Sequence, residues 1–245
     1  TLLFTANPPF ATQPLLQLKP GYDIKAFTPI AKLASVPNAL ITSGNAPYTG
    51  IAQLLAFARA NPGKLNYAHS GAGTTAHIDM ERIKKLAKLD IASISYKSSS
   101  QAMIDTLAGQ INLQLPSLPA AMPHVASGKA RLLAIGSARR KESLPGVPTL
   151  AEAFGSPGLE SSIWYAMFGP AGLPQDVVAR LGAELAKAMA SAQIKDLLAQ
   201  SGIEAAYAGS QELAALVAQD SQRARQTLDD IGVFGRVAPE HKVRL

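Results

Sequence analysis

The sequence predicts an α/β protein of two lobes that are joined by two crossing strands. From about Leu40 to Gly136, short β-rich runs alternate with helical runs, which is typical of βαβ units around a mostly parallel sheet. Residues 144–158 are rich in Pro and Gly and break this alternation. The chain that follows is mostly helical, so it must borrow strands from the start of the chain to complete a sheet. Two lobes joined twice form a hinge with a cleft between them, an arrangement used for closure around a ligand.

The alternating region contains helices with clear start and stop signals. Thr49 can cap a helix that Asn61-Pro62-Gly63 ends, and Thr74 or Thr75 can cap a helix that runs to Ala87. Apolar residues recur at helical spacing in both helices. The other predicted helices are 99–108 and 118–127, and the predicted strands are 65–68, 91–94, 111–115 and 131–135.

The other lobe combines the two ends of the chain. Its expected strands are Thr1–Thr5, which resembles a buried strand, Thr28–Val36 and Ile163–Gly169. Helices are expected to start at Pro174 and Ser210, each followed by apolar residues in helical register. We therefore expect a discontinuous first lobe of residues 1–37 and 160–245, and a second lobe of residues 38–159.

Composition excludes several classes of protein. The 245 residues are 47% hydrophobic and 16% charged, which argues against disorder. Charged or polar residues interrupt every apolar run before the roughly 18 residues that a membrane span needs, so we expect no stable membrane insertion. The net charge of +6 attracts anions, but no aromatic residues interleave the basic clusters, so we expect no nucleic-acid binding. The absence of Cys excludes thiolate metal sites and thiol nucleophiles.

The most informative segment joins a strand to a helix through Ser70-Gly71-Ala72-Gly73-Thr74-Thr75, which we call the anion loop. Backbone N–H groups at a helix start have no intrahelical partner, and the positive end of the helix dipole lies behind them. Gly71 and Gly73 let an anion approach the backbone, while the hydroxyls of the loop can add donors. The segment therefore predicts a carboxylate site without an Arg, to which His69 could also donate.

Two alternatives to this anion site remain open. The glycines can serve only to turn the chain, with Thr75 as a plain helix cap. Gly71-x-Gly73-x-x-Ala76 also satisfies the dinucleotide fingerprint superficially, with Asp90 as the acidic residue that the fingerprint requires roughly twenty residues further along the chain. The acid of that fingerprint belongs at the carboxyl end of the second strand, whereas Asp90 precedes its strand, so we expect no cofactor.

Metal and catalytic interpretations find little support. His77 and Glu81 share a helix face but supply two ligands where zinc needs three or four, so we interpret His77, Asp79 and Glu81 as a solvated face and expect no metal. His124 is interpreted as a structural histidine in an apolar helix. The common hydrolase, metalloprotease and NTPase motifs are absent, and we expect no enzyme.

A second strand-to-helix loop, 96–101, is expected beside the anion loop at the carboxyl edge of the sheet. It offers hydroxyls from Tyr96 and Ser98. Trp164 lies on the second crossing strand, where plain core packing and a cleft wall both remain open.

Together these segments resemble the Bug family, the extracytoplasmic solute receptors of tripartite tricarboxylate transporters. The resemblance rests, in order, on Asn61-Pro62-Gly63-Lys64-Leu65-Asn66-Tyr67, Ser70-Gly71-x-Gly73-Thr74, Tyr96-Lys97, Leu118-Pro119-x-x-x-Pro123-His124, Val147-Pro148-Thr149-Leu150-Ala151-Glu152-Ala153, and Trp164 with Gly169-Pro170-Ala171-Gly172. It implies a periplasmic-binding-protein-like fold of type II, with an organic acid held in the cleft largely by backbone donors and water. The family's N-terminal βα unit is expected to be missing from this chain.

The departures from the family pattern bear on the ligand. Ala72 stands where the family often has Asn, and Ser95-Tyr96-Lys97-Ser98 stands where it has Pro-Tyr-Lys-Gly. Pro116, with Ser117 beside it, replaces a frequent Asp, which favours an acid without an amino group. The candidate ligand-binding residues are Ser70, Gly71, Ala72, Gly73, Thr74, Thr75, His69, Tyr96, Ser98 and Ser117.

The resemblance implies a periplasmic receptor that captures a small di- or tricarboxylate, or another carboxylate, by hinge closure. Its partners would be the ligand and, transiently, the permease subunits of the transporter, and we expect a monomer. Two alternatives are a nucleotide-dependent enzyme that uses the Gly71 loop and a carboxylate sensor that acts on a signalling protein.

Overall fold

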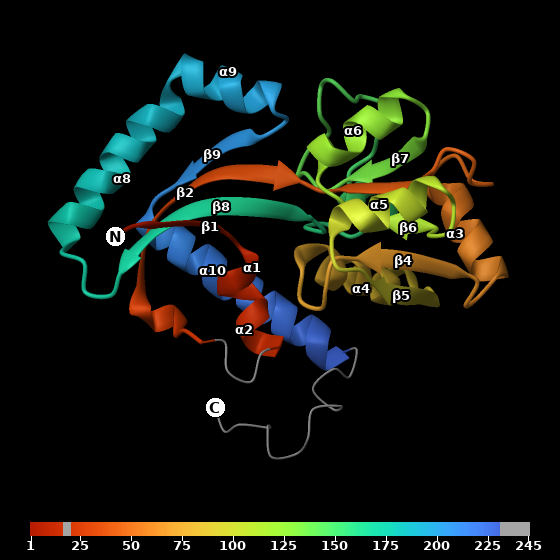
Figure 1. Cartoon of the computed structure of the whole chain (residues 1–245), viewed down its shortest axis with the longest axis horizontal. Coiled ribbons are helices and arrows are strands. Elements are labelled where there is room, and N and C mark those ends of the chain that lie inside the picture. Colours follow the sequence, from red (N-terminus) through yellow and green to blue (C-terminus); the bar gives the residue numbers. More distant parts are fainter. Residues whose placement is uncertain (17–20, 231–245) are drawn as a thin grey trace, which may run out of the picture. The chain divides into compact units, whose positions relative to one another are not determined.

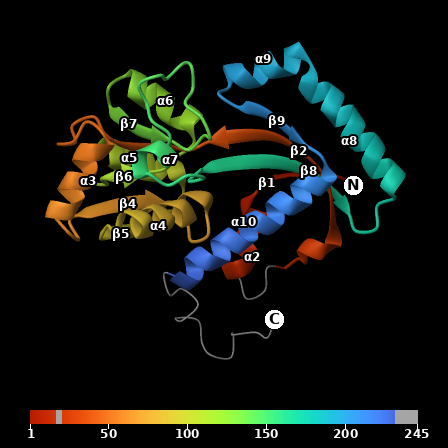
Figure 2. The same ribbon diagram turned by 180° about the vertical axis from the view of Figure 1, so that it is seen from behind.

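The computed structural model describes residues 1–16 and 21–230, and the chain divides into two compact units. One unit joins Thr1–Ser35 to the chain from Ile163 onward, and the other is Val36–Ser162. We call them the terminal unit and the central unit. Each is built around its own β-sheet, which can be followed in Figure 1 and from behind in Figure 2.

The central unit contains a five-stranded sheet in the order β5-β4-β6-β3-β7. Its strands are β3 (Ala39–Ser43), β4 (Leu65–His69), β5 (Ile91–Ser95), β6 (Leu113–Gln114) and β7 (Ala130–Ile135). Strand β4 pairs in parallel with β5 and β6, whereas β3 runs antiparallel to β6 and β7. Four strands therefore share one direction, which confirms the mostly parallel sheet, and the carboxyl ends of β5, β4 and β6 lie at one edge.

Helices cover both faces of this sheet. Alternate residues of a strand point to opposite faces, so Tyr67 packs with α3 (Ile51–Ala60), α4 (Thr75–Ala87) and α7 (Leu150–Phe154). Its neighbour Ala68 faces α5 (Ser99–Leu107). Helix α6 (Leu118–Ala126) packs against Ile41 on this second face. The arrangement confirms an α/β unit with helices on both faces of the sheet.

The terminal unit contains a four-stranded sheet in the order β1-β8-β2-β9. Its strands are β1 (Leu3–Ala6), β2 (Phe27–Pro37), β8 (Ser162–Pro170) and β9 (Glu204–Ala208). This order confirms that the second part of the chain borrows strands from the start. The helices of the unit are α1 (Pro8–Ala11), α2 (Gln13–Leu16), the 3₁₀ helix Ile24–Ala26, α8 (Gln175–Ala190), α9 (Ala192–Gln200) and α10 (Ser210–Asp230).

The faces of β8 divide the core of the terminal unit. Trp164 and Phe168 pack with Phe10 of α1 and Leu213 of α10 on one face, whereas Met167 packs with residues of α8 on the other. Trp164 is 2% exposed, and its indole Nε1–H donates to Asp220 Oδ2 at 2.7 Å. This residue therefore packs in the core of its own unit.

Several expectations about single elements are wrong. Gly50, not Thr49, occupies the cap position of α3, because the N–H and hydroxyl of Thr49 donate to Gln53 Oε1 at 2.7 and 2.8 Å. The first strand is not buried: Leu3 and Phe4 are 38% and 56% exposed, since β1 is an edge strand. Helices α7 and α9 and strand β9 were not predicted. Among the described residues, no helix is both long and apolar enough to cross a membrane.

Candidate functional site

The anion loop leaves the carboxyl end of β4 and opens α4. Gly71 and Gly73 have φ angles of +123° and +75°, a region that side chains with a Cβ disfavour. Thr74, and not Thr75, is the helix cap, because its Oγ1 accepts from the N–H of His77 at 3.4 Å. The two glycines are therefore required by the backbone conformation that brings the loop into the first turn of α4.

Internal hydrogen bonds fix the shape of the anion loop. The N–H groups of Gly71 and Gly73 donate to the imidazole Nδ1 atoms of His69 and His77, at 3.1 and 3.3 Å. The hydroxyl of Thr74 donates to Gly71 O at 2.9 Å, and the N–H of Thr74 donates to the same oxygen at 3.4 Å. The two glycine N–H groups are thus already used inside the protein, contrary to the simplest form of the prediction.

Other donors of the loop remain open. Within the described chain, no acceptor takes the backbone N–H of Ala72, Thr75 or Ala76, the last two being the first helical residues of α4. The C=O and N–H of one peptide unit point in opposite directions, so the bonds from Thr74 to Gly71 O turn the Ala72 N–H away from the loop interior. Thr75 Oγ1 is buried and has no partner among the described residues. The N–H groups at this helix start, with the helix dipole behind them, can hold an anionic oxygen, and the Thr75 hydroxyl lies in the same turn.

The second predicted loop lies beside the first. The N–H of Tyr96 donates to His69 O at 2.8 Å, which joins the two loops at the carboxyl edge as expected. Its side-chain groups, however, are engaged elsewhere. The Tyr96 hydroxyl donates to Asp105 Oδ2 at 2.6 Å, a bond that raises the pKa of Tyr96, and Ser98 Oγ caps α5 by accepting from the Gln101 N–H at 3.2 Å.

The last candidate residue, Ser117, follows the carboxyl end of β6 and stands at the cap position of α6 without a side-chain cap bond. Its backbone forms a β-bridge with Asn38. The structure therefore brings all ten candidate residues to one edge of the sheet, on the ends of three neighbouring strands or the loops after them.

The predicted solvated helix face is wrong. His77, Asp79 and Glu81 are 8%, 6% and 7% exposed, because α4 packs against the sheet on one side and against α7 on another. Glu81 accepts from the Tyr67 hydroxyl at 2.7 Å and pairs with Lys84 at 2.8 Å, and Asp79 pairs with Arg82 at 3.2 Å. The i, i+4 spacing of His77 and Glu81 indicated a shared face, but it could not show that the face is covered.

Burial sets the protonation state of both histidines. Burial lowers the pKa of His69, and burial together with the neighbouring His69 lowers the pKa of His77 to about 4. Both imidazoles are therefore neutral at pH 7, as their acceptor role at Nδ1 requires. Within the part of the chain that the structure describes, no group of three or more His, Cys, Asp or Glu could hold a metal ion.

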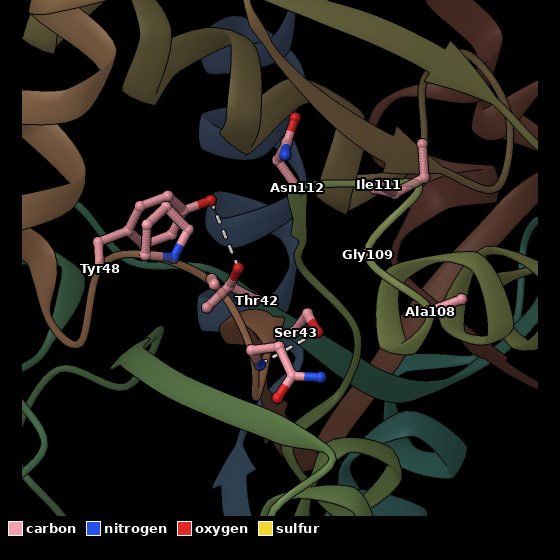
Figure 3. Close-up of a pocket in the computed structure, with 10 residues that line it drawn as sticks. Thr42, Ser43, Tyr48, Ala108, Gly109, Ile111 and Asn112 are labelled. Atoms are coloured by element: carbon pink, nitrogen blue, oxygen red, sulfur yellow. Dashed lines mark hydrogen bonds between the residues drawn. The ribbon is translucent and has the colours of Figure 1, made fainter.

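A pocket of about 190 Å³ lies at the opposite edge of the same sheet (Figure 3). Thr42 and Tyr48 line it beside Asn112, and the Thr42 hydroxyl donates to the Tyr48 hydroxyl at 3.4 Å. Its residues lie at the end of β3, after β3 or before β6, so they belong to the amino edge of the parallel strands. None of the ten candidate residues lines this pocket.

The geometry argues against the dinucleotide alternative. Asp90 directly precedes β5, and its backbone oxygen accepts from the Gly63 N–H at 3.1 Å. It therefore lies at the amino end of β5, whereas the anion loop lies at the carboxyl edge. An acid in that place cannot contact a ribose whose phosphates the loop holds.

Comparisons with known proteins agree with this architecture. The UPF0065 protein in the tcbD-tcbE intergenic region of Pseudomonas sp. strain P51 is 35% identical over 204 residues, which cover 83% of this chain and 61% of that protein. The structure of R. palustris Rpa4515 with adipate is 31% identical with a TM-score of 0.83, and the match covers 95% of this chain and 78% of that one. The periplasmic binding protein BugD is 29% identical with a TM-score of 0.78, and the coverage is 95% and 78%.

The family model described as the tripartite tricarboxylate transporter family receptor, TctC, matches residues 1–233. This match takes in both sheets and the anion loop. The chain belongs to the TctC family of tripartite tricarboxylate transporter receptors, which includes the Bug proteins.

Proposed function

We propose that this protein is an extracytoplasmic receptor that binds a small carboxylate at the anion loop. The observation that carries the proposal is the set of open donors at the start of α4: the N–H groups of Ala72, Thr75 and Ala76 and the unpaired, buried Thr75 hydroxyl. A carboxylate has two acceptor oxygens and a negative charge, so it can use several of these donors together with the helix dipole. No cationic side chain is needed for such a site.

The identity of the ligand class is supported by family membership and by one relative. R. palustris Rpa4515, which is 31% identical, has adipate, a dicarboxylate, in its structure. The candidate ligand is therefore a small di- or tricarboxylate, and the absence of an acid at Pro116 and Ser117 favours one without an amino group. That the two lobes close on this ligand stays a prediction.

The cellular location and the partners of the protein are also inferred from its relatives. BugD is described as a periplasmic binding protein, and we propose the periplasm for this chain as well. The chain spans 61% of its relative from Pseudomonas sp. strain P51. The permease subunits of a tripartite tricarboxylate transporter would be its partners, and the protein would act on its ligand without chemical change.

A thermal-shift screen tests this function. The full-length protein is heated with mono-, di- and tricarboxylates, with adipate as the first probe and with NAD and ATP as the competing class. A ligand at about 100 times its Kd stabilises the folded state by about 2.7 kcal/mol, a readily measured shift. We expect a shift with at least one carboxylate and none with the nucleotides. A shift with NAD or ATP, and with none of the carboxylates, would contradict the receptor function and favour the nucleotide-dependent enzyme.

A further inference from the structure

Beneath the anion loop lie two buried histidines that the proposed carboxylate site does not itself use. We propose that His69 and His77 are positioning residues: as neutral imidazoles they hold the N–H groups of Gly71 and Gly73, fix the loop in its binding shape, and release it in acid. The expected effect on ligand binding rests on the proposed function, whereas the anchoring of the loop by the two histidines does not depend on a ligand.

The two contacts are alike in chemistry. Each histidine lies at one end of the loop, His69 at the end of β4 and His77 in the first turn of α4. Each accepts a glycine N–H at Nδ1, at 3.1 Å for His69 and 3.3 Å for His77. The ring centroids are 4.4 Å apart, so the two rings form one buried pair. The loop is thus held from both ends by the same pair.

Only the neutral imidazole can make these contacts. An Nδ1 that accepts a hydrogen bond carries a lone pair, so the ring proton must reside on Nε2. Protonation places a second N–H at Nδ1, directly opposite the glycine N–H, and the two donors repel. Because Gly71 and Gly73 have wide backbone freedom, the loop then loses its fixed shape, and ligand binding must supply the cost of ordering it.

Among the surrounding charges, the Glu81 carboxylate raises the pKa of both histidines, but burial outweighs it. Glu81 and Lys84 of α4 and the Tyr67 ring of β4 face the histidines. The Glu81 carboxylate is already engaged by the Lys84 ammonium at 2.8 Å and by the Tyr67 hydroxyl at 2.7 Å. Asp79 is engaged by Arg82 on the same helix. Burial lowers the pKa of both histidines in agreement with this arrangement.

The sign of the pH effect separates this role from direct ligand contact. If His69 donated to the carboxylate, as the sequence analysis allowed, acid would add positive charge beside the ligand and strengthen binding. If the pair positions the loop, acid weakens binding. The change begins below the ordinary His pKa of about 6.5 and is complete near the lowered pKa of His77, about 4.

The experiment compares the wild-type protein with a non-titrating replacement. In His69→Asn/His77→Asn, the amide oxygen stands where Nδ1 stood, one bond from Cγ, and accepts the same N–H at any pH. Full-length protein is titrated with adipate by calorimetry between about pH 7.5 and 4.5. Adipate gains protons in the same range, so the double Asn variant serves as the control for titration of the ligand.

Relative to its own affinity at neutral pH, the wild-type protein should lose more affinity in acid than the double Asn variant does. A His69→Leu/His77→Leu protein, which lacks both acceptors, should bind about tenfold more weakly at neutral pH. Wild-type affinity that rises in acid relative to the Asn variant would overturn the proposal.

A second measurement needs no ligand. In wild-type protein, the amide NMR signals of Gly71 and Gly73 should move together with the titration of the two imidazoles, and in the Asn variant they should stay in place. If the amide signals of Gly71 and Gly73 do not change as the histidines titrate, the proposed anchoring is wrong even if adipate binds. If no carboxylate binds at neutral pH, the proposed function fails while this measurement still decides the anchoring.

Discussion

Two strand-to-helix turns lie side by side at the carboxyl edge of the central sheet, and they differ in what they leave open. After β4, two glycines with positive φ lead into α4, and Thr75 keeps a buried hydroxyl without a partner among the described residues. After β5, the turn contains no glycine, Ser98 closes the start of α5, and the Tyr96 hydroxyl is taken by Asp105. The two turns therefore differ in the glycines and in the unpaired Thr75 hydroxyl of the first, although Thr74 and Ser98 both cap the helix that follows.

The difference shows why hydroxyl-rich loops are ambiguous in a sequence. A Ser or Thr at a helix start can either serve the helix or serve a ligand, and its hydrogen bonds decide between the two. In the first turn Thr74 caps the helix, which leaves Thr75 free for another role. We therefore expect substitutions in the first turn to change affinity and those in the second to change mainly stability.

The largest effect is expected from Gly73→Val. A β-branched residue at a φ of +75° is strained by about 1–2 kcal/mol and must distort the loop, so carboxylate binding should be lost. Gly172→Val is the matched control, because Gly172 has a φ of +73° and lies in the terminal unit with open space around its Cβ position. Calorimetry on both variants should show lost binding only for Gly73→Val. Equal affinities of the Gly73→Val and Gly172→Val proteins would show that the anion loop does not form the binding site.

Thr75→Val should have the next largest effect. The substitution keeps the shape of the side chain and removes the unpaired hydroxyl, so affinity should fall about tenfold while thermal stability holds or rises. Thr42→Val, at the opposite edge of the sheet, removes another buried hydroxyl and serves as the control. A fall in affinity for Thr42→Val but not for Thr75→Val would move the ligand to the pocket of Figure 3.

Tyr96→Phe should have the smallest effect on binding. The lost hydroxyl bonds to Asp105, so we expect a fall of about 1 kcal/mol in the free energy of unfolding and a change in affinity below that of Thr75→Val. Denaturant unfolding and calorimetry on the same samples measure both. A loss of affinity larger than that of Thr75→Val would show that the ligand contacts the second turn rather than the first.

The elements around the site were largely predictable because their signals are local. Thr74 and the apolar spacing up to Ala87 define α4, and the glycines mark the turn before it. The family resemblance extended this reading to both units, and the match over residues 1–233 confirms it.

What the sequence could not show depends on tertiary contacts. The polar residues of α4 indicated a solvated face, but α7 covers α4, so His77 and Glu81 are buried. Helix α7 itself was hidden in a Pro/Gly-rich stretch, although Thr149 and Glu152 form a capping box there. Strand β9 is a short run, EAAYA, made mostly of Ala, a residue depleted in strands, and it pairs with β2.

Amide NMR during titration with adipate tests most directly whether backbone donors at the start of α4 hold the ligand. The N–H signals of Ala72, Thr75 and Ala76 should shift first and furthest as adipate is added to the full-length protein, since a hydrogen bond to a carboxylate deshields the amide proton. Shifts confined to Thr42, Ser43 and Asn112, with the α4 signals unmoved, would contradict the assignment of the site.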